Sequence, residues 1–449
     1  MKRSKMKKSL MLLTVFAMVF ALAACGGKDN DTGNDGAVNG SGEEAVTIKA
    51  IGHTTWFIQG MEAVMVEAKK QGFNLEIEKV PDGSDGENLM KTRFATNDKP
   101  DLLFYQSAIT QSAGFGNPEE VFVAQDDQPW MQNFDKVAWK NLMDSDDNLQ
   151  DDVESHWYGA PYGGANTGMV LYNKKLFAEL KLEIPTNMDE FWAVSEKIKS
   201  AGKTPVFLSG KDAWTVQLPV LMSNATQETA DLIAKINVNQ AKVTDLEDSK
   251  TGMKFLQELM SKGMVNDDVL SATYDEAQKA LSEGEAGMYL MATWVMNEIV
   301  TKYPEGVNDI GAFIMPYKGE GKDLAALWQP WSMYVVKGPK QDAVQEFVNW
   351  FEQPEIQDIF FSNQGGIPAI KGVTKTKLTP AEVDAKKFLD AGQGLGNVPY
   401  PPLYNYNVNL PTLSQELIIK GGKTPEQVLE AQQKELETAA KAKGDPNFK

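Results

Sequence analysis

Short apolar runs alternate with helix-period segments along residues 46–105. Strand patterns are predicted at Val46–Ile51, Leu75–Val80 and Leu102–Tyr105. Between them, Ile58–Gln71 and Asp85–Thr96 place apolar residues three and four positions apart, which is typical of amphipathic helices. Strands that alternate with helices in units of this size predict an α/β fold with mostly parallel sheets.

The same alternation continues after residue 157, and the pattern shows no tandem repeat. Thr186 is predicted to cap a helix, with Asp189 three residues on in a capping-box arrangement. The pattern predicts strands from Met169 and at Thr204–Leu208, Gly287–Met291 and Ile310–Met315, and helices at Lys174–Leu180, across most of Ala230–Ser282, at Gln341–Phe351 and at Gln427–Lys443.

Residues 1–24 have the layout of a secretory signal. Five basic residues precede the apolar run Ser9–Ala24, which is shorter than the roughly 20 residues needed to span a bilayer. Leu22-Ala23-Ala24-Cys25 resembles the bacterial lipobox, which implies that Cys25 is acylated and anchors the chain in a membrane. The alternative is a signal peptide that ends near a cysteine by chance. The polar segment 25–45 is expected to be a disordered tether.

Charge and composition exclude several classes of function. The net charge of −18, which becomes about −23 without the signal, disfavours binding to nucleic acid or anionic lipid. A single cysteine excludes an internal disulfide. The chain has two histidines, His53 and His156, which are too few for a His-rich metal site. We therefore expect no metal and no cofactor.

A series of short blocks spans nearly the whole chain after residue 45 and resembles the extracellular solute-binding proteins of ABC importers, in particular the carbohydrate-binding group related to maltose-binding protein. The blocks are Lys99-Pro100-Asp101-Leu102-Leu103-Phe104, Tyr158-Gly159-Ala160-Pro161-Tyr162, Tyr172-Asn173-Lys174-Lys175-Leu176-Phe177, Ile184-Pro185-Thr186-Asn187-Met188-Asp189-Glu190-Phe191, Gly202-Lys203-Thr204-Pro205-Val206, Leu281-Ser282-Glu283-Gly284-Glu285-Ala286-Gly287-Met288-Tyr289, Ile314-Met315-Pro316 and Thr424-Pro425-Glu426-Gln427-Val428-Leu429.

The resemblance implies a two-lobed periplasmic-binding-protein fold of type II, each lobe a mostly parallel sheet flanked by helices. By matching blocks, residues 46–162 and 331–365 form the N-terminal lobe, and residues 163–330 and 366–449 form the C-terminal lobe. The chain would cross the hinge near Ala160–Gly164, Trp328–Trp331 and Gly365–Pro368. Glycine or proline beside aromatics suits positions that absorb the backbone change when two lobes close.

The resemblance also implies the function: a non-catalytic protein that binds a sugar or oligosaccharide between two lobes and delivers it to importer permease subunits. We expect a lipid-anchored monomer at the outer face of the cytoplasmic membrane of a Gram-positive-type bacterium, or in the periplasm of a Gram-negative one.

Candidate ligand residues lie in loops beyond predicted strand ends, where α/β sheets bind ligands. Aromatic rings stack on sugar faces, and planar polar groups satisfy pairs of ring hydroxyls. The candidates are Trp56, Tyr105, Gln106, Asn166, Lys211, Asp212, Trp214, Trp294, Trp328, Trp331, Gln364 and Tyr404. Each aromatic has an alternative role in core packing, Asn166 has one as a turn former, and Lys211 and Asp212 could pair with each other.

The alternative function is a secreted glycan-processing enzyme such as a glycosidase. That chemistry requires two carboxylates that flank one bond, and Asp212 is the single acid suitably placed in the predicted loops. The acidic stretch 144–152 begins like a calcium loop but lacks the needed Gly and the closing Glu, so a solvated turn is the better interpretation.

Overall fold

The structure is a computed structural model. It describes residues 45–57, 59–81, 84–96, 98–107, 113–134, 156–319, 321–328, 330–396, 409–442 and 444–449. Cys25, Tyr404 and the stretch 144–152 lie outside the described residues.

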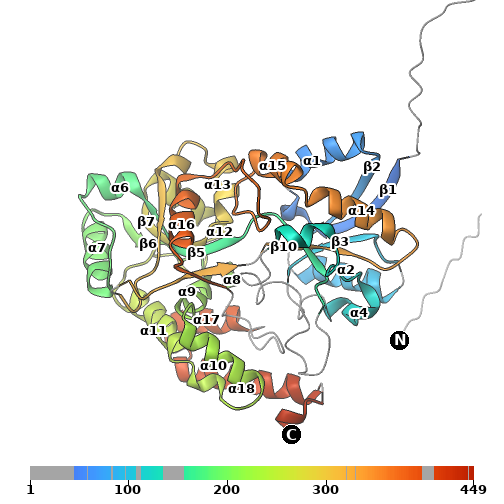
Figure 1. The fold of residues 1–449 in the computed structure, drawn as a ribbon. Helices are drawn as coiled ribbons and strands as arrows, with labels where there is room; N and C mark the ends of the chain where they lie inside the picture. The colour runs from blue at the N-terminus through green and yellow to red at the C-terminus, as the bar shows by residue number, and fades with distance from the viewer. Residues whose placement is uncertain are drawn as a thin grey trace, which may run out of the picture. The chain divides into compact units, whose positions relative to one another are not determined.

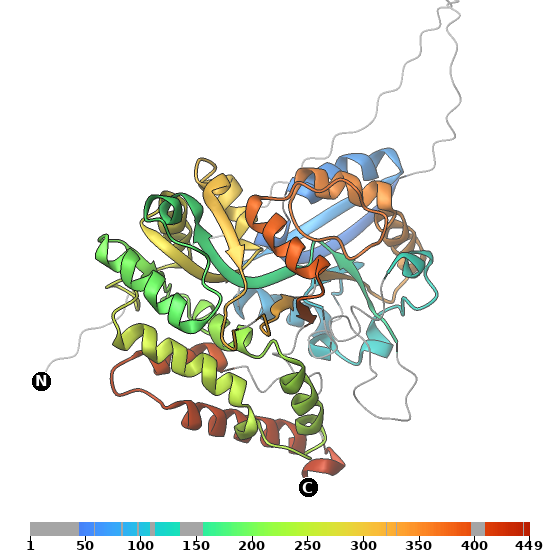
Figure 2. The same ribbon diagram turned by 60° about the vertical axis from the view of Figure 1, so that its left-hand side comes forward.

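The first sheet has the strand order β2-β1-β3-β10-β4. Its strands are β1 (Val46–His53), β2 (Phe73–Val80), β3 (Leu102–Tyr105), β4 (Gly159–Tyr162) and β10 (Trp331–Val335). Its helices are α1 (Gln59–Lys70), α2 (Ser84–Ala95), α4 (Pro118–Val121), α14 (Gln341–Phe351) and α15 (Pro354–Asn363). Helix α15 packs along α1, so two segments far apart in the sequence share one core (Figures 1 and 2).

The second sheet has the order β11-β9-β5-β7-β6, and β8 pairs with β5. Its strands are β5 (Asn166–Asn173), β6 (Thr204–Val206), β7 (Ala286–Ala292), β8 (Ile310–Phe313), β9 (Ala325–Trp328) and β11 (Gly394–Gly396). Its helices are α6 (Lys174–Glu179), α7 (Met188–Ser200), α8 (Ala213–Val216), α9 (Leu218–Ser223), α10 (Gln227–Asn237), α11 (Glu247–Ser261), α12 (Tyr274–Glu283), α13 (Val295–Lys302), α16 (Pro380–Asp390), α17 (Leu410–Ile418) and α18 (Pro425–Ala442). Helices α11, α17 and α18 pack together (Figure 1).

Short 3-10 turns complete the described secondary structure. They are η1 (Thr54–Trp56), η2 (Ala113–Phe115), η3 (Pro129–Asn133), η4 (Val243–Asp245), η5 (Val307–Asp309) and η6 (Pro446–Phe448).

Each sheet has its own hydrophobic core. The first core takes buried side chains from residues 48–165 and 333–370, and the second takes them from 169–326 and 381–448. All four residues of β3 are buried, and full burial of an apolar side chain of this size contributes about 1.5–3 kcal/mol. We call the two halves the first lobe and the second lobe. This two-core arrangement agrees with the predicted two-lobed α/β fold.

The prediction of mostly parallel sheets is confirmed, with one reversed strand in each sheet, β10 in the first and β5 in the second. Strand β1 is parallel to β2 and β3, but β10 runs antiparallel to both β3 and β4. In the second sheet, β5 is antiparallel to β7, β8 and β9. The reason is the route of the chain: β4 leaves the first lobe and β10 enters it at the same end of the sheet, so the two strands must run in opposite directions.

The predicted cap of the helix after Pro185 is displaced by one residue. Helix α7 begins at Met188, and the Asn187 side chain accepts the N–H of Glu190 at 2.9 Å. Thr186 instead donates its N–H and its hydroxyl to the Glu190 carboxylate, both at 2.8 Å. Asn competes well with Thr as an N-cap, which explains the shift.

Candidate functional site

In the first lobe, a cluster of aromatic rings covers the end of the sheet where β1 and β3 finish. Trp56 stacks on Trp331 with ring centroids 5.1 Å apart and planes 20° apart. Tyr105 meets Trp56 at 5.8 Å, and Tyr162 lies 6.2 Å from Trp331 in a stacked arrangement. We call Trp56, Tyr105, Tyr162 and Trp331 the first-lobe cluster.

Most of the first-lobe cluster is buried. Trp56 is 8% exposed and Tyr105 is 2% exposed, so both have the core-packing role that the sequence left open. Burial, with a smaller contribution from Glu87, raises the pKa of the Tyr105 hydroxyl well above its usual range. Trp331 is half-buried and covers Trp56, so Trp331 is the ring of this cluster best placed to contact a ligand.

In the second lobe, three tryptophans from distant segments form a row. Trp294 lies 6.3 Å from Trp214 with planes tilted by 45°, and 5.6 Å from Trp328 with planes 79° apart. Trp214 is 37% exposed, and the other two are half-buried. We call these three residues the tryptophan row. Because their planes turn from one ring to the next, they form an angled apolar surface rather than a flat one.

The sheet register explains why the row assembles. Gly168 at the start of β5 pairs with Ala292 at the end of β7, two residues before Trp294. Asn166 pairs with Trp328 at the end of β9. Strand β6 is parallel to β7, so the chain that follows it, including α8 and Trp214, emerges at the same end of the sheet.

Trp214 packs against Tyr274, a residue that is not among the predicted candidates. The Tyr274 ring packs edge-on against Trp214 at 4.9 Å, and the Tyr274 N–H donates to Asp212 Oδ2 at 2.7 Å. Burial raises the pKa of the Tyr274 hydroxyl well above its usual range. No local pattern indicates this contact, because the two aromatic rings come from separate helices, α8 and α12.

The polar candidates have different environments. Gln106 and Lys211 are exposed, which leaves both side chains accessible. The Asn166 amide donates to the Gly164 carbonyl at 3.0 Å, as expected of a turn former. Asp212 is half-buried, and its Oδ2 accepts the Tyr274 N–H. Gln364 is buried and its Oε1 accepts the Gly60 N–H at 3.3 Å, so this side chain fastens the end of α15 to α1.

Two short links bring the two aromatic surfaces near each other. The chain passes from β4 to β5 between Tyr162 and Asn166, and from β9 to β10 between Trp328 and Trp331. Three peptide steps span at most about 11 Å between α-carbons, so Trp328 of the row and Trp331 of the cluster are neighbours. The structure thus places aromatic residues of both lobes around the same two crossings.

The first and third predicted crossings touch each other. The Ala165 N–H donates to the Ile367 carbonyl at 2.7 Å, and a β-carbon on Gly164 would lie 2.5 Å from Gly366 Cα. Gly366 has φ +125°, a conformation that favours glycine. Glycine is therefore required at both positions for the two segments to approach.

After this contact, the chain returns to the first lobe. Ile370 forms a bridge with Phe134, and the Lys371 N–H donates to the Asn133 carbonyl at 2.8 Å. Ala381 of α16 then lies in the second core. These contacts favour a final change of lobe between Ile370 and Ala381, later than the predicted Gly365–Pro368. The exact lobe limits stay a prediction.

The chain matches a family model described as bacterial extracellular solute-binding protein over residues 52–358. It belongs to this family. It is 23% identical to the multiple sugar-binding protein of Streptococcus mutans over 389 residues, which cover 84% of this chain and 86% of that protein.

Two solved structures resemble this solute-binding protein in fold. A chitin oligosaccharide binding protein aligns with a TM-score of 0.70 at 21% identity, over 88% of this chain and 99% of its own. The solute-binding protein RafE in complex with raffinose aligns with a TM-score of 0.68 at 19% identity, over 87% and 98%. The two-lobed fold predicted from the sequence is confirmed.

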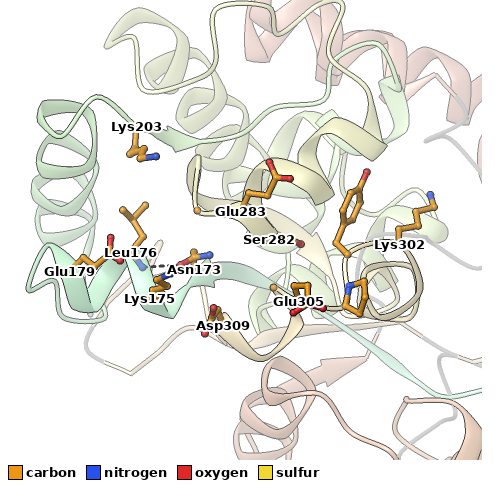
Figure 3. A pocket seen from close by; sticks show the side chains of 14 residues that line it. Asn173, Lys175, Leu176, Glu179, Lys203, Ser282, Glu283, Lys302, Glu305 and Asp309 are labelled. Carbon is orange, nitrogen blue, oxygen red and sulfur yellow. Dashed lines mark hydrogen bonds between the residues drawn. The ribbon is translucent and has the colours of Figure 1, made fainter.

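A cavity of about 620 Å³ lies elsewhere in this solute-binding protein (Figure 3). Asn173 at the end of β5 and Glu283 before β7 line it, so it opens at the end of the second sheet opposite the tryptophan row. Two lysines that line it, Lys203 and Lys302, are paired with Glu285 at 2.8 Å and Asp275 at 2.9 Å. None of the candidate ligand residues lines this cavity.

Two further features bear on the class of site. Within the described ranges, no group of three or more His, Cys, Asp or Glu side chains is arranged to hold a metal ion. No helix in the same ranges is long and apolar enough to cross a bilayer.

Proposed function

We propose that this solute-binding protein binds a sugar or oligosaccharide between its two lobes and delivers it to the permease subunits of an ABC importer. The observation that carries the proposal is that each lobe has an aromatic surface at the crossing from β9 to β10, where Trp328 of the row and Trp331 of the cluster are three residues apart. Aromatic faces are the surfaces on which sugar rings stack.

Within the site, Trp214, Trp294 and Trp328 would stack on the sugar from the second lobe, and Trp331 would cover it from the first. Gln106, Asn166 and Lys211 would supply polar groups near these strand ends. Trp56, Tyr105 and Gln364 would act indirectly, since their side chains are buried. Tyr404 keeps its predicted ligand role.

The names of similar proteins support a carbohydrate. The Streptococcus mutans relative is a multiple sugar-binding protein, and the fold neighbours bind chitin oligosaccharide and raffinose. We further propose that acylated Cys25 anchors a monomeric chain at the outer face of the cytoplasmic membrane.

A glycosidase activity has less support. It needs two carboxylates on either side of one bond, and the Asp212 carboxylate already accepts the Tyr274 N–H. Members of the family are solute-binding proteins.

The test is a thermal-shift and calorimetry screen with raffinose, chitin oligosaccharides and other glycans, with glutamine as a non-sugar control. Hydrolysis of each glycan is followed in parallel. We expect at least one glycan to raise the melting temperature without being cleaved. Stabilisation by glutamine alone, or by none of the compounds while the protein is folded, would contradict a carbohydrate ligand. Cleavage of a bound glycan would favour the enzyme.

A further inference from the structure

Helix α16 of the second lobe begins with a capping box whose acid is buried. The Glu382 carboxylate accepts the N–H and the hydroxyl of Thr379, both at 2.8 Å and both on the same oxygen. Glu382 is only 2% exposed. Capping boxes normally lie at the surface, as the one formed by Thr273 and Glu276 on α12 does.

The carboxylate is buried because it rests against residues 364–368, which contact the first crossing and precede the final change of lobe; we call these residues the third hinge segment. A β-carbon on Gly365 would lie 2.6 Å and 2.7 Å from the two Glu382 oxygens. Gln364, which precedes Gly365, accepts a hydrogen bond from Gly60 of α1 in the first lobe. Ile367, two residues after Gly365, pairs with Ala165. The Glu382 carboxylate of the second lobe therefore contacts the third hinge segment at Gly365. This residue lies between Gln364, which is bonded to the first lobe, and Ile367, which pairs with Ala165.

Among the residues that the structure describes, none contributes a compensating positive charge to Glu382. Burial raises the pKa of this carboxyl to about 7, although the two Thr379 hydrogen bonds act in the opposite direction. None of the titratable residues on α16, on the segment before it or on the elements packed against it contributes to this shift; they are Lys371, Lys375, Lys377, Asp384, Lys386, Lys387, Asp390, Tyr172 and Asp309. Lys377 is exposed, and Asp384 is bonded to the Ala312 N–H and to Lys387.

We propose that Glu382 makes the hinge sensitive to protons: the neutral carboxyl holds Gly365 in place, and the ionised carboxylate favours states in which this segment moves away and admits water. Ionisation places a charge where water is excluded, and retreat of the hinge segment removes that cost. The proposal rests on the contact between α16 and the hinge, not on the identity of the ligand.

The sign follows from linkage. The pKa of Glu382 in the folded protein lies above the ordinary value of 4.5, so the closely packed hinge is stabilised by protonation. This stabilisation is complete below about pH 4.5 and is lost as the pH rises through about 7. If opening returned the carboxyl to its ordinary pKa, the open fraction would rise up to about 75-fold between pH 5 and pH 8.5.

The test is hydrogen–deuterium exchange of the full chain without sugar, at pH values from 5 to 8.5. The reporters are the hinge peptides 160–170 and 361–370, and rates are compared with E382Q at each pH so that intrinsic exchange cancels. We expect the wild-type to E382Q rate ratio to rise about tenfold or more across this range. E276Q is the matched control, because Glu276 has the same capping geometry but is exposed, and it should follow the wild type.

A ratio that stays constant with pH, or a similar change in E276Q, would overturn the proposal. If thermal melts show that E382Q does not fold, the wild-type chain alone provides the test. The ratio of the exchange rate of the hinge peptides to that of α14 should then rise with pH, and a constant ratio would overturn the proposal. Because no sugar is present, failure here leaves the proposed ligand untouched, and failure of the glycan screen leaves the hinge result untouched.

Discussion

Replacing Gly164 with alanine places a methyl group where the first and third crossings touch. The new carbon would lie 2.5 Å from Gly366 Cα and 2.6 Å from the Ile367 nitrogen, and both of these are backbone atoms. Ordinary contacts begin near 3.4 Å. No side-chain rotation can relieve the overlap, so the two crossings must separate by roughly 1 Å, which costs about 1–3 kcal/mol in a packed region.

Separation also weakens the hydrogen bonds between Ala165 and Ile367, which are 2.7 Å and 3.4 Å long. Each typically contributes about 0.5–1.5 kcal/mol. We therefore expect Gly164→Ala to lower the free energy of unfolding by about 2–4 kcal/mol. The control is Gly338→Ala, because a β-carbon there meets no atom within 4 Å and its φ is not in the left-handed range. That change should stay within about 0.5–1 kcal/mol.

Urea unfolding of both variants measures the difference, provided that the slope with denaturant is unchanged. Calorimetry with a glycan from the screen then shows whether the separated hinge also changes affinity. A loss below about 1 kcal/mol for Gly164→Ala, or equal losses for the two variants, would show that the crossings are not tightly packed.

Trp214→Ala should weaken glycan binding by about 1–3 kcal/mol with a small change in melting temperature. Trp56→Ala should instead lower the free energy of unfolding by about 3–5 kcal/mol, because Trp56 is buried. Calorimetry and thermal melts of both variants test this, and similar behaviour of the two would contradict it. Cys25→Ala should release the protein from membranes without changing glycan affinity, and equal membrane retention in fractionation would refute the lipid anchor. Burial raises the pKa of Glu352 well above 4.5, so the stability of the wild type should fall as the pH rises above about 4.5. Glu352→Gln should reduce that fall, as measured by urea unfolding at pH 5 and pH 8. An equal loss of stability between these pH values in the variant and the wild type would contradict this.

Elements formed by local periodicity were predictable from the sequence. Strand β3 and helix α14 have the predicted limits, because a continuous apolar run and a helical stripe need no distant partner to be recognised. The one reversed strand of each sheet was not predictable. The route of β10 depends on where the chain re-enters the first lobe, and no local pattern encodes this.

The candidate site was predictable in part. Residues after strand ends, such as Trp294 and Trp214, do lie together in the second lobe. Whether an aromatic residue faces ligand or core depends on a partner far away in sequence: Trp56 is buried because Trp331 stacks on it. The burial of Glu382 was likewise not predictable, because the local sequence shows an ordinary capping box and the third hinge segment that covers the carboxylate is a separate segment.

The most direct test of a ligand held between two lobes is small-angle scattering with and without a saturating glycan from the screen. A sugar that touches both lobes stabilises the closed form by its differential affinity for the two states. The radius of gyration should then decrease at saturation. A glycan that binds by calorimetry while the radius of gyration stays the same would contradict the proposed site between the lobes.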